Sequence, residues 1–139
     1  MDTSNPAPLL MLGGGVVVAL GSILDWRDFG LGNGLSGLSF DNMGLFGLIV
    51  LLAGIALAAV GGIRAFAPQT SLPSALAGFT LDQLLFFLGV TVFLWSFALI
   101  AADATAIGVH LTWIGAAVAV AGLVLSMRKA VPTGPPRTF

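Results

Sequence analysis

Four long apolar segments dominate the chain and limit what it can fold into. They cover about residues 8–24, 44–63, 81–102 and 107–127. Each is about 17–22 residues long, and a helix needs about 20 residues to cross the hydrocarbon core of a bilayer. Strands are excluded for these segments because an open sheet edge leaves backbone groups unpaired in lipid. The pattern predicts an all-α membrane protein, a bundle of four transmembrane helices forming one domain over residues 1–130.

The composition supports the same class. Hydrophobic residues make up 58% of the 139 positions and charged residues 8%, and the mean hydropathy is +1.06. A soluble domain carries about 25% charged residues, so a soluble domain this short could not cover so much apolar surface. The net charge of −1 gives no indication of a nucleic-acid partner, and the absence of Cys excludes disulfides and thiol chemistry.

The placement of Lys and Arg predicts that both termini lie in the cytoplasm, with the protein in the plasma (inner) membrane. That orientation leaves only Arg27 outside and places four basic residues inside: Arg64, Arg128, Lys129 and Arg137. The first segment is expected to be a retained helix, since no Lys or Arg precedes it and no clear cleavage site follows. Its run Gly13-Gly14-Gly15 weakens the helix. Residues 131–139 hold three prolines and are predicted to form a disordered cytoplasmic tail.

The start of the third segment has a recognisable capping pattern. Thr80 and Gln83 have the T-x-x-Q spacing in which each side chain bonds the other residue's backbone N–H. Asp82 falls in the first turn, where the positive end of the helix dipole favours a carboxylate. We therefore interpret Asp82 as structural. The segment between Arg64 and Phe79 contains two prolines and is predicted to be a cytoplasmic loop.

Small residues repeat along one face of the second and fourth predicted helices. In lipid, helices associate through close van der Waals contact, and small faces let two backbones approach. Such faces either close the chain's own bundle or bind another protein, and the sequence leaves both alternatives open. The interface candidates on these faces are Gly54, Ala58, Gly61, Gly62, Gly108, Thr112, Gly115, Ala119 and Gly122.

The third predicted helix carries large aromatic side chains instead of small ones. Its aromatic side chains are expected to face lipid or a partner's helices, and four of them are further interface candidates: Phe86, Phe93, Trp95 and Phe97. Trp95 lies about 10 Å from the outer end at 1.5 Å per residue. We expect it to pack inside the protein or on a partner, with Ser96 or Thr112 accepting from its N–H.

The predicted outer loop, residues 25–43, contains GLGNGLSG and therefore the spacing G-x-G-x-x-G. A dinucleotide site requires a strand before these glycines and a helix that opens at them, whereas a membrane helix precedes them here. We interpret the glycines as bends that lay apolar side chains over the bundle, with Trp26 at the interface and Asp41 capping the second helix. The loop is a cap or a docking surface, with the candidates Trp26, Arg27, Phe29, Leu31, Leu35 and Leu38.

Charged residues are absent from the cores of the four apolar segments, and an enzyme or ion-coupled transporter needs ionisable groups within the membrane or at a pocket. The chain has no Glu, which argues against proton-coupled export. His110 is the single His, and a metal site needs three or four ligands, so we interpret it as an interfacial, hydrogen-bonded residue. We therefore expect no catalytic residues, no metal and no cofactor.

Several residues of the first half resemble small four-helix membrane proteins common in actinobacteria: Gly21-Ser22, Trp26, Ser36-Gly37 and Gly44. Members often carry Pro where this chain has Asp25. The resemblance implies the topology and no settled activity. The leading hypothesis is a non-enzymatic accessory or structural subunit of a larger membrane complex. The alternatives are a carrier for an apolar or lipid molecule, which would bind in a cavity lined by Phe93, Trp95 and Phe97, and a holin-like oligomeric pore.

Overall fold

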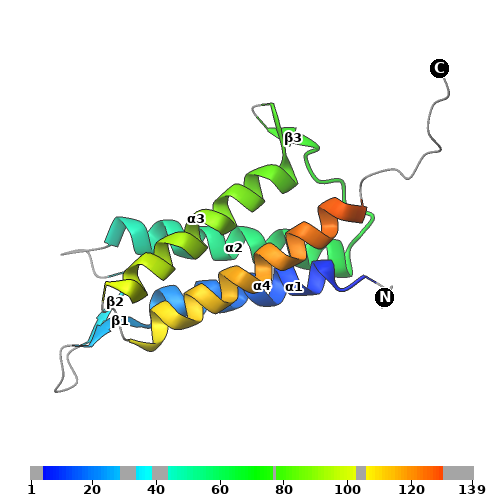
Figure 1. The fold of residues 1–139 in the computed structure, drawn as a ribbon. Coiled ribbons are helices and arrows are strands. Elements are labelled where there is room, and N and C mark those ends of the chain that lie inside the picture. The colour runs from blue at the N-terminus through cyan, green and yellow to red at the C-terminus, as the bar shows by residue number, and fades with distance from the viewer. Residues whose placement is uncertain (1–4, 29–33, 39–43, 77, 103–105, 130–139) are drawn as a thin grey trace.

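The structure, a computed structural model, describes residues 5–28, 34–38, 44–76, 78–102 and 106–129, and for residues 27, 28, 34, 35 and 44 it describes only the backbone. The described chain contains four helices, drawn in Figure 1: α1 (Ala7–Ile23), α2 (Gly44–Phe66), α3 (Leu81–Ala101) and α4 (Ile107–Lys129). The four predicted helices are therefore confirmed. The predicted disordered tail at 131–139 lies outside the described residues.

Two short antiparallel hairpins connect the helices. Strand β1 (Asp25–Asp28) pairs with β2 (Gly34–Ser36) after α1, and β3 (Ala75–Leu76) pairs with β4 (Phe79–Thr80) before α3. Gly78 in the second hairpin has φ of +85°, a left-handed conformation that suits a residue without Cβ. The sequence analysis predicted neither hairpin and treated both segments as irregular loops.

Three of the described helices are long and apolar enough to cross a membrane: residues Leu45–Phe66 of α2, all of α3 and all of α4. This indicates a multi-pass membrane protein. Helix α1 has 17 residues and is shorter. At 1.5 Å per residue it measures about 25 Å, somewhat less than the roughly 30 Å of a hydrocarbon core.

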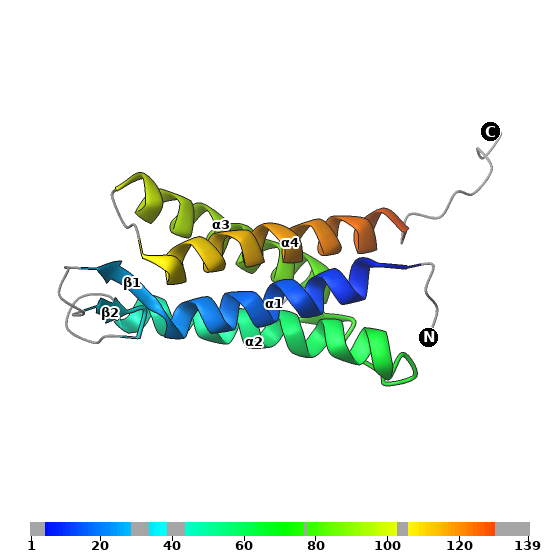
Figure 2. The same cartoon turned by 90° about the horizontal axis from the view of Figure 1, so that it is seen from below.

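Helix α1 lies between α2 and α4, and α3 crosses obliquely over the outside of α4, with fewer contacts to α2 (Figures 1 and 2). Successive helices run in opposite directions. The start of α1 and the end of α4 lie together at one end of the bundle, which we call the terminal end. Strands β1 and β2 lie at the opposite end, which we call the hairpin end.

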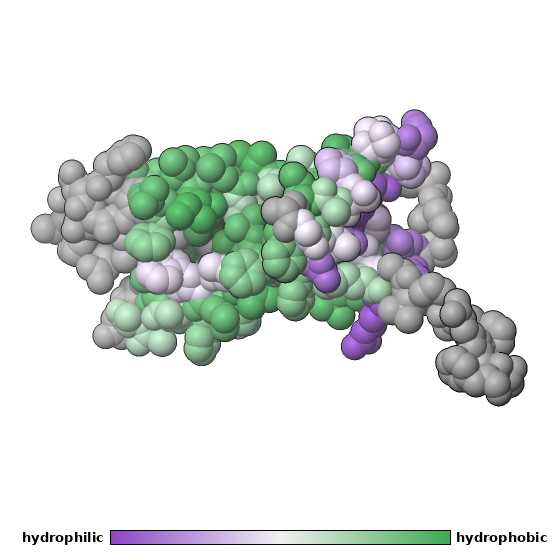
Figure 3. Space-filling model, turned by 90° about the horizontal axis from the view of Figure 1, so that it is seen from above, coloured by the Kyte–Doolittle hydropathy of each residue, from purple (hydrophilic) through white to green (hydrophobic). Residues whose placement is uncertain are grey.

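Two buried clusters form the core, and each takes side chains from all four helices. The cluster nearer the hairpin end consists of Val18, Trp26, Val50, Ala53, Val92, Val109 and Ala116. The other consists of Met11, Leu57, Leu85, Ala119 and Leu123. Most other large apolar side chains lie on the outside, where Figure 3 shows a continuous hydrophobic band along the helices. The fold therefore combines a narrow core with an apolar exterior, as lipid permits.

Candidate functional site

The small-residue face of α4 packs directly against α1. A Cβ atom built on Gly14 would lie 2.5 Å from the Ala119 nitrogen and 2.6 Å from the Gly115 carbonyl oxygen, and one built on Gly21 would lie 2.5 Å from the Thr112 hydroxyl oxygen. The backbones approach so closely that these glycines leave no room for a side chain. Gly108 and Gly122 approach α1 in the same way, with the added atom 2.8 Å from the carbonyl oxygens of Gly21 and Ala7, respectively.

The small-residue face of α2 packs on the other side of α1. A Cβ atom on Gly54 would lie 2.6 Å from the Ala19 nitrogen and one on Gly61 would lie 2.5 Å from the Leu12 nitrogen, while Gly15 lies against the backbone of Ala58. Gly62 is half-buried beside α1. Both small-residue faces are therefore covered from within the chain, which is the first of the two alternatives that the sequence left open. The glycines of α1, which weaken an isolated helix, are what make this packing possible.

Trp26 does not lie at an exposed interface as predicted; it is buried, with 2% of its surface exposed. Its indole N–H donates to the carbonyl oxygen of Gly21 at 2.8 Å. Gly21 is in the last turn of α1, where carbonyl groups have no partner within the helix. Trp26 therefore stabilises the C-terminal end of α1 and fills the space between α1 and the hairpin. Because its ring is buried there, it is not available to bind a partner protein.

Two glycines hold the hairpin against this ring. The Gly37 N–H donates to the Leu24 carbonyl oxygen at 3.3 Å. A Cβ atom on Gly37 would lie 2.6 Å from the Ser22 carbonyl oxygen and 2.7 Å from the Trp26 ring, and Gly47 of α2 lies directly against the Gly37 carbonyl group. We call Gly21, Trp26, Gly37 and Gly47 the Trp26 cap.

The Trp26 cap brings together residues that carry the sequence resemblance, namely Gly21-Ser22, Trp26 and Ser36-Gly37. Leu38 is half-buried beside it. The other candidates of the loop lie outside the described residues or have only their backbone described: Phe29, Leu31, Asp41, and the side chains of Arg27 and Leu35. The structural role that the described part of the loop shows is therefore to close the hairpin end.

The aromatic side chains of α3 divide between two neighbours. Trp95 stacks on Phe46 of α2, with ring centroids 4.4 Å apart and an interplanar angle of 16°, and 37% of its surface is exposed. Phe93 and Phe97 lie instead beside Trp113 of α4, at centroid distances of 5.6 and 6.3 Å. Of the three residues proposed to line one carrier cavity, Trp95 therefore lies on a different neighbour from Phe93 and Phe97. Phe86 is half-buried against the cluster at the terminal end.

The indole N–H of Trp95 does not bond the residues expected to accept it. Ser96 donates to the carbonyl oxygens of Val92 and Phe93, and Thr112 donates to that of Gly108. Within the described part of the chain, no hydrogen bond from Trp95 is formed, although its ring packs on Phe46. The stacked pair of Phe46 and Trp95 is therefore partly exposed beside the first turn of α2, and the indole N–H of Trp95 has no acceptor among the described residues. We call it the Phe46–Trp95 face.

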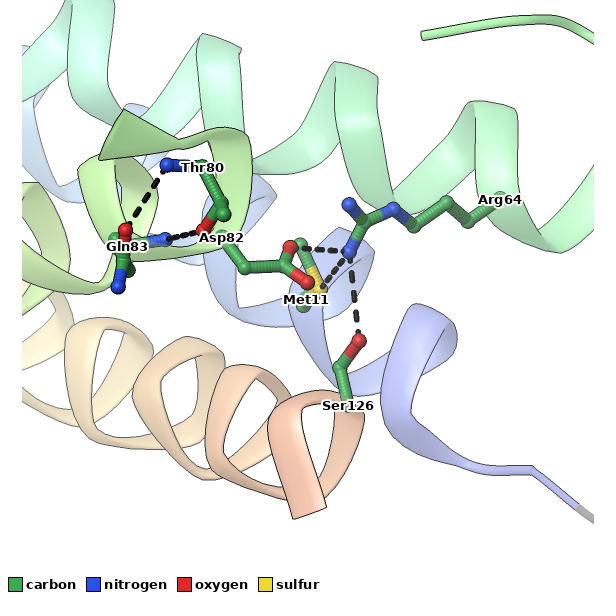
Figure 4. Close-up of polar contacts among 6 residues, drawn as sticks. All are labelled: Met11, Arg64, Thr80, Asp82, Gln83 and Ser126. Carbon is green, nitrogen blue, oxygen red and sulfur yellow. Dashed lines mark hydrogen bonds and ion pairs between the residues drawn. The ribbon is translucent and has the colours of Figure 1, made fainter. Parts of the chain in front are cut away.

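Arg64 links all four helices at the terminal end, as Figure 4 shows. It lies in the last turn of α2, which extends to Phe66 through the start of the predicted loop. One terminal nitrogen lies 2.6 Å from the Asp82 carboxylate of α3, 3.4 Å from the Ser126 hydroxyl of α4 and 4.0 Å from the Met11 sulfur of α1. Side-chain exposure is 24% for Arg64 and 22% for Asp82. The contact with Asp82 is an ion pair of close approach and not an aligned hydrogen bond, since this carboxylate oxygen has no hydrogen bond of good geometry among the described residues.

The capping pattern at the start of α3 is confirmed. The Gln83 N–H donates to the Thr80 hydroxyl at 3.2 Å, and the Thr80 N–H donates to the Gln83 side-chain oxygen at 2.9 Å. This cap fixes the first turn of α3 and with it the position of Asp82. The sequence analysis identified the structural role of Asp82 without its partner, because Arg64 lay within a predicted loop.

His110 lies in the first turn of α4, with its Nδ1 atom 3.0 Å from the Ala106 carbonyl oxygen. Across the described ranges, no group of three or more His, Cys, Asp or Glu residues could hold a metal ion. The described arrangement therefore supplies helix packing, a closed hairpin end and a polar link at the terminal end. Comparison of the chain with protein-family models, with curated proteins and with solved structures gave no match.

Proposed function

We propose that this chain is a non-enzymatic accessory or structural subunit of a larger complex in the plasma membrane. In this proposal all four helices cross the bilayer, both termini are cytoplasmic, and the partner binds on the outside of α2 and α3. The basic side chains at the terminal end support this orientation, because cytoplasmic borders are rich in Lys and Arg. The resemblance to small actinobacterial four-helix proteins, which have no settled activity, belongs to the same proposal.

The observation that carries the proposal is the Phe46–Trp95 face. An indole N–H that faces hydrocarbon without an acceptor costs about 1–3 kcal/mol, judged from mutational data on other polar groups. A carbonyl or hydroxyl group on a partner helix would supply an acceptor that the described residues do not provide, while Phe46 and Trp95 would supply a large rigid contact area. The small-residue faces are no longer part of the docking surface, since α1 covers them.

The interior supports a structural role more than a transport role. Three polar side chains are fully buried in the helices: Ser22, Ser96 and Thr112. Each donates its hydroxyl to a carbonyl oxygen three or four residues earlier in its own helix. Their hydrogen-bonding capacity is therefore used within the chain. Neither alternative has a supporting observation. The small faces of a holin-like pore are covered by α1, and in a carrier cavity Trp95 would lie apart from Phe93 and Phe97, which share Trp113 as a neighbour.

Affinity purification from native membranes in mild detergent tests the proposal. The wild-type chain is expected to bring down a specific membrane protein, and the double variant Phe46→Ala/Trp95→Ala to lose it. The matched control is Leu52→Ala/Ile55→Ala, which removes two exposed side chains of α2 outside the stacked pair. A wild-type chain that purifies alone as a monomer would contradict the proposal, and equal loss in both double variants would move the partner's site away from the Phe46–Trp95 face.

A further inference from the structure

We propose that the β3–β4 hairpin anchors the terminal end in the lipid headgroup layer, with the side chains of Leu76 and Phe79 turned toward the acyl chains. These two residues are 50% and 56% exposed. Single exposed apolar side chains are ordinary in a loop that faces water, so their exposure alone does not indicate lipid contact. What distinguishes this pair is the place of the hairpin, the face that the two side chains share and the way in which the hairpin is fixed.

The hairpin lies at the border of the membrane-spanning segments. Strand β4 ends at Thr80, and α3 begins at the next residue. The ion pair of Arg64 with Asp82 places the first turn of α3 level with the last turn of α2, whose span ends at Phe66. Figure 1 shows the hairpin standing out sideways from the bundle, next to the start of α3. In a protein whose α2 and α3 cross the bilayer, this level beside the bundle is the headgroup layer.

The pairing of the two strands puts the large apolar side chains on one face of the hairpin. Leu76 is directly opposite Phe79, and Ala75 is directly opposite Thr80. Opposed residues of an antiparallel pair share a face, and successive residues of a strand alternate between faces. Leu76 and Phe79 therefore form one face, which we call the Leu76–Phe79 face. The other face carries the small side chain of Ala75 and the polar one of Thr80.

The hairpin is fixed to the start of α3 by the capping pair. The Thr80 hydroxyl accepts from the Gln83 N–H, and the Gln83 side-chain oxygen accepts from the Thr80 N–H. Because Thr80 belongs to both β4 and the cap, the face opposite the Leu76–Phe79 face is tied to α3. The Leu76–Phe79 face is thus presented in a set orientation, which lowers the conformational entropy lost on contact with lipid.

The size of the hairpin fits the headgroup layer. Two residues per strand, at about 3.4 Å each, give a length of about 7 Å. A bilayer about 40–45 Å thick with a hydrocarbon core of about 30 Å leaves about 5–8 Å on each side. A two-stranded hairpin has two open edges, whose backbone groups find partners in interfacial water but not in hydrocarbon. The backbone therefore belongs in the headgroup layer, and only the Leu76–Phe79 face reaches the acyl boundary, as in amphipathic interfacial helices.

Site-directed spin labelling of the full chain in phosphatidylcholine vesicles tests the anchor. The chain has no Cys, so each single-cysteine variant carries one label. Leu76→Cys places the label on the proposed lipid face, and Ala75→Cys, the matched control, places it on the opposite face. Gln69→Cys, in the exposed polar part of the same connection, is the water reference, and Leu94→Cys, exposed on α3, is the hydrocarbon reference.

Collisions with a water-soluble nickel complex measure how far each label lies from water. The label at residue 76 should collide with this complex several-fold less often than the label at residue 69, and less often than the label at residue 75. The label at residue 94 should collide with it least. Equal collision at residues 69, 75 and 76 would overturn the anchor. A label at residue 75 that is better protected than the one at residue 76 would overturn the assignment of the Leu76–Phe79 face to lipid.

A second variant shows whether the apolar face itself holds the hairpin in the headgroup layer. Leu76→Ser/Phe79→Ser, labelled through Ala75→Cys, removes this face and keeps the cap of Thr80 and Gln83. Collisions of this label with the nickel complex should rise to the level of the water reference, while circular dichroism shows unchanged helix content. Unchanged collisions would show that α3 alone sets the depth of the hairpin, and the anchor would be wrong.

The vesicles contain only this chain and a lipid without net charge. The result therefore does not depend on a partner protein at the Phe46–Trp95 face, and the anchor can fail while the proposed function holds, or the reverse. A Leu76–Phe79 face that is open to water in these vesicles would exclude lipid as its occupant and leave a partner protein in its place.

Discussion

Helices α1 and α3 are both apolar, but they are held in the bundle by different means. Helix α1 lies between α2 and α4 with backbone against backbone, and its glycines face Gly54 and Ala58 on one side and Gly115 and Ala119 on the other. Helix α3 lies on the outside, and its buried residues are Leu85, Gly89, Val92 and Ser96. Among the described residues, ring contacts, one ion pair and the core side chains Leu85 and Val92 connect it to its neighbours.

The difference shows how a short chain can form a bundle in lipid, where burying apolar side chains gives little gain. The helices at the centre of the bundle must then be held together by close van der Waals contact, which requires small residues on both of the helices that pack together. The outer helix needs fewer such contacts and keeps its large side chains for lipid or for a partner. We therefore expect substitutions in α1 to affect folding and substitutions on the outside of α3 to affect binding.

The strongest test of this comparison is Gly15→Leu in α1. The new side chain would meet the backbone of Ala58 and Gly54, which cannot move without separating α1 from α2. We expect a loss of about 3 kcal/mol or more in unfolding free energy, at or above the upper end for overpacked cores. Unfolding in mixed detergent–SDS micelles, followed by circular dichroism, measures it.

The sequence offers a matched control two residues away. A Cβ atom on Gly13 would meet no atom within 4 Å, and the residue is exposed. Gly13→Leu should therefore be neutral or stabilising by a few tenths of a kcal/mol, because Leu favours a helix more than Gly does. If both variants lost the same stability, the loss would not come from the contact of α1 with α2.

The second test concerns the polar link that holds α3. Asp82→Asn removes the charge that faces Arg64 and leaves the guanidinium with Ser126 and Met11. Because the pair is partly exposed, we expect a cost of about 1–2 kcal/mol, between that of a surface pair and that of a buried pair. The same unfolding assay measures it.

A double-mutant cycle with Arg64→Met separates the pair from its surroundings. The sum of the losses in unfolding free energy of the two single variants should exceed the loss of the double variant, since each single change leaves one charge without its partner. Additive losses would show that Asp82 acts on the helix dipole of α3 alone. The link from α3 to the rest of the bundle would then consist of apolar packing only.

The sequence predicted the four helices well because apolar runs of about 20 residues have few alternatives in a membrane. The capping pair of Thr80 and Gln83 was also predictable, since both partners lie within four residues of each other. Neither prediction depends on where other helices lie.

The tertiary contacts were harder to predict because their partners are far apart in the chain. Arg64 and Ser126 are separated by 62 positions, and the sequence placed Arg64 in a loop. Trp26 is of a residue type that commonly anchors helices at the membrane interface. In the structure the β1–β2 hairpin covers it instead, and its N–H donates to the carbonyl oxygen of Gly21. The small-residue faces of α2 and α4 could be recognised in the sequence. Their partner surface on α1 was not recognised, because its glycines were interpreted only as residues that weaken the helix.

The third test examines the Trp26 cap at the end of α1. Trp26→Phe keeps an aromatic ring and removes the N–H that bonds the Gly21 carbonyl oxygen. We expect a loss of about 1 kcal/mol, the typical net value of a hydrogen bond inside a protein. Amide hydrogen exchange should rise in the last turn of α1 and remain unchanged at the start of α3. Faster exchange at both ends would mean that the cap stabilises the whole bundle and not α1 in particular.

The smallest effect is expected on the outside of α3. Phe87 is 74% exposed, so Phe87→Ala should change the unfolding free energy in detergent by less than about 0.5 kcal/mol, the usual limit for surface substitutions. Phe97, with 53% exposed, also lies beside Trp113, so Phe97→Ala should cost somewhat more. A loss of several kcal/mol for Phe87→Ala in the same unfolding assay would show that α3 folds with its outer face covered. The proposed difference between α1, which stabilises the fold, and α3, whose outer face is available for binding, would then be wrong.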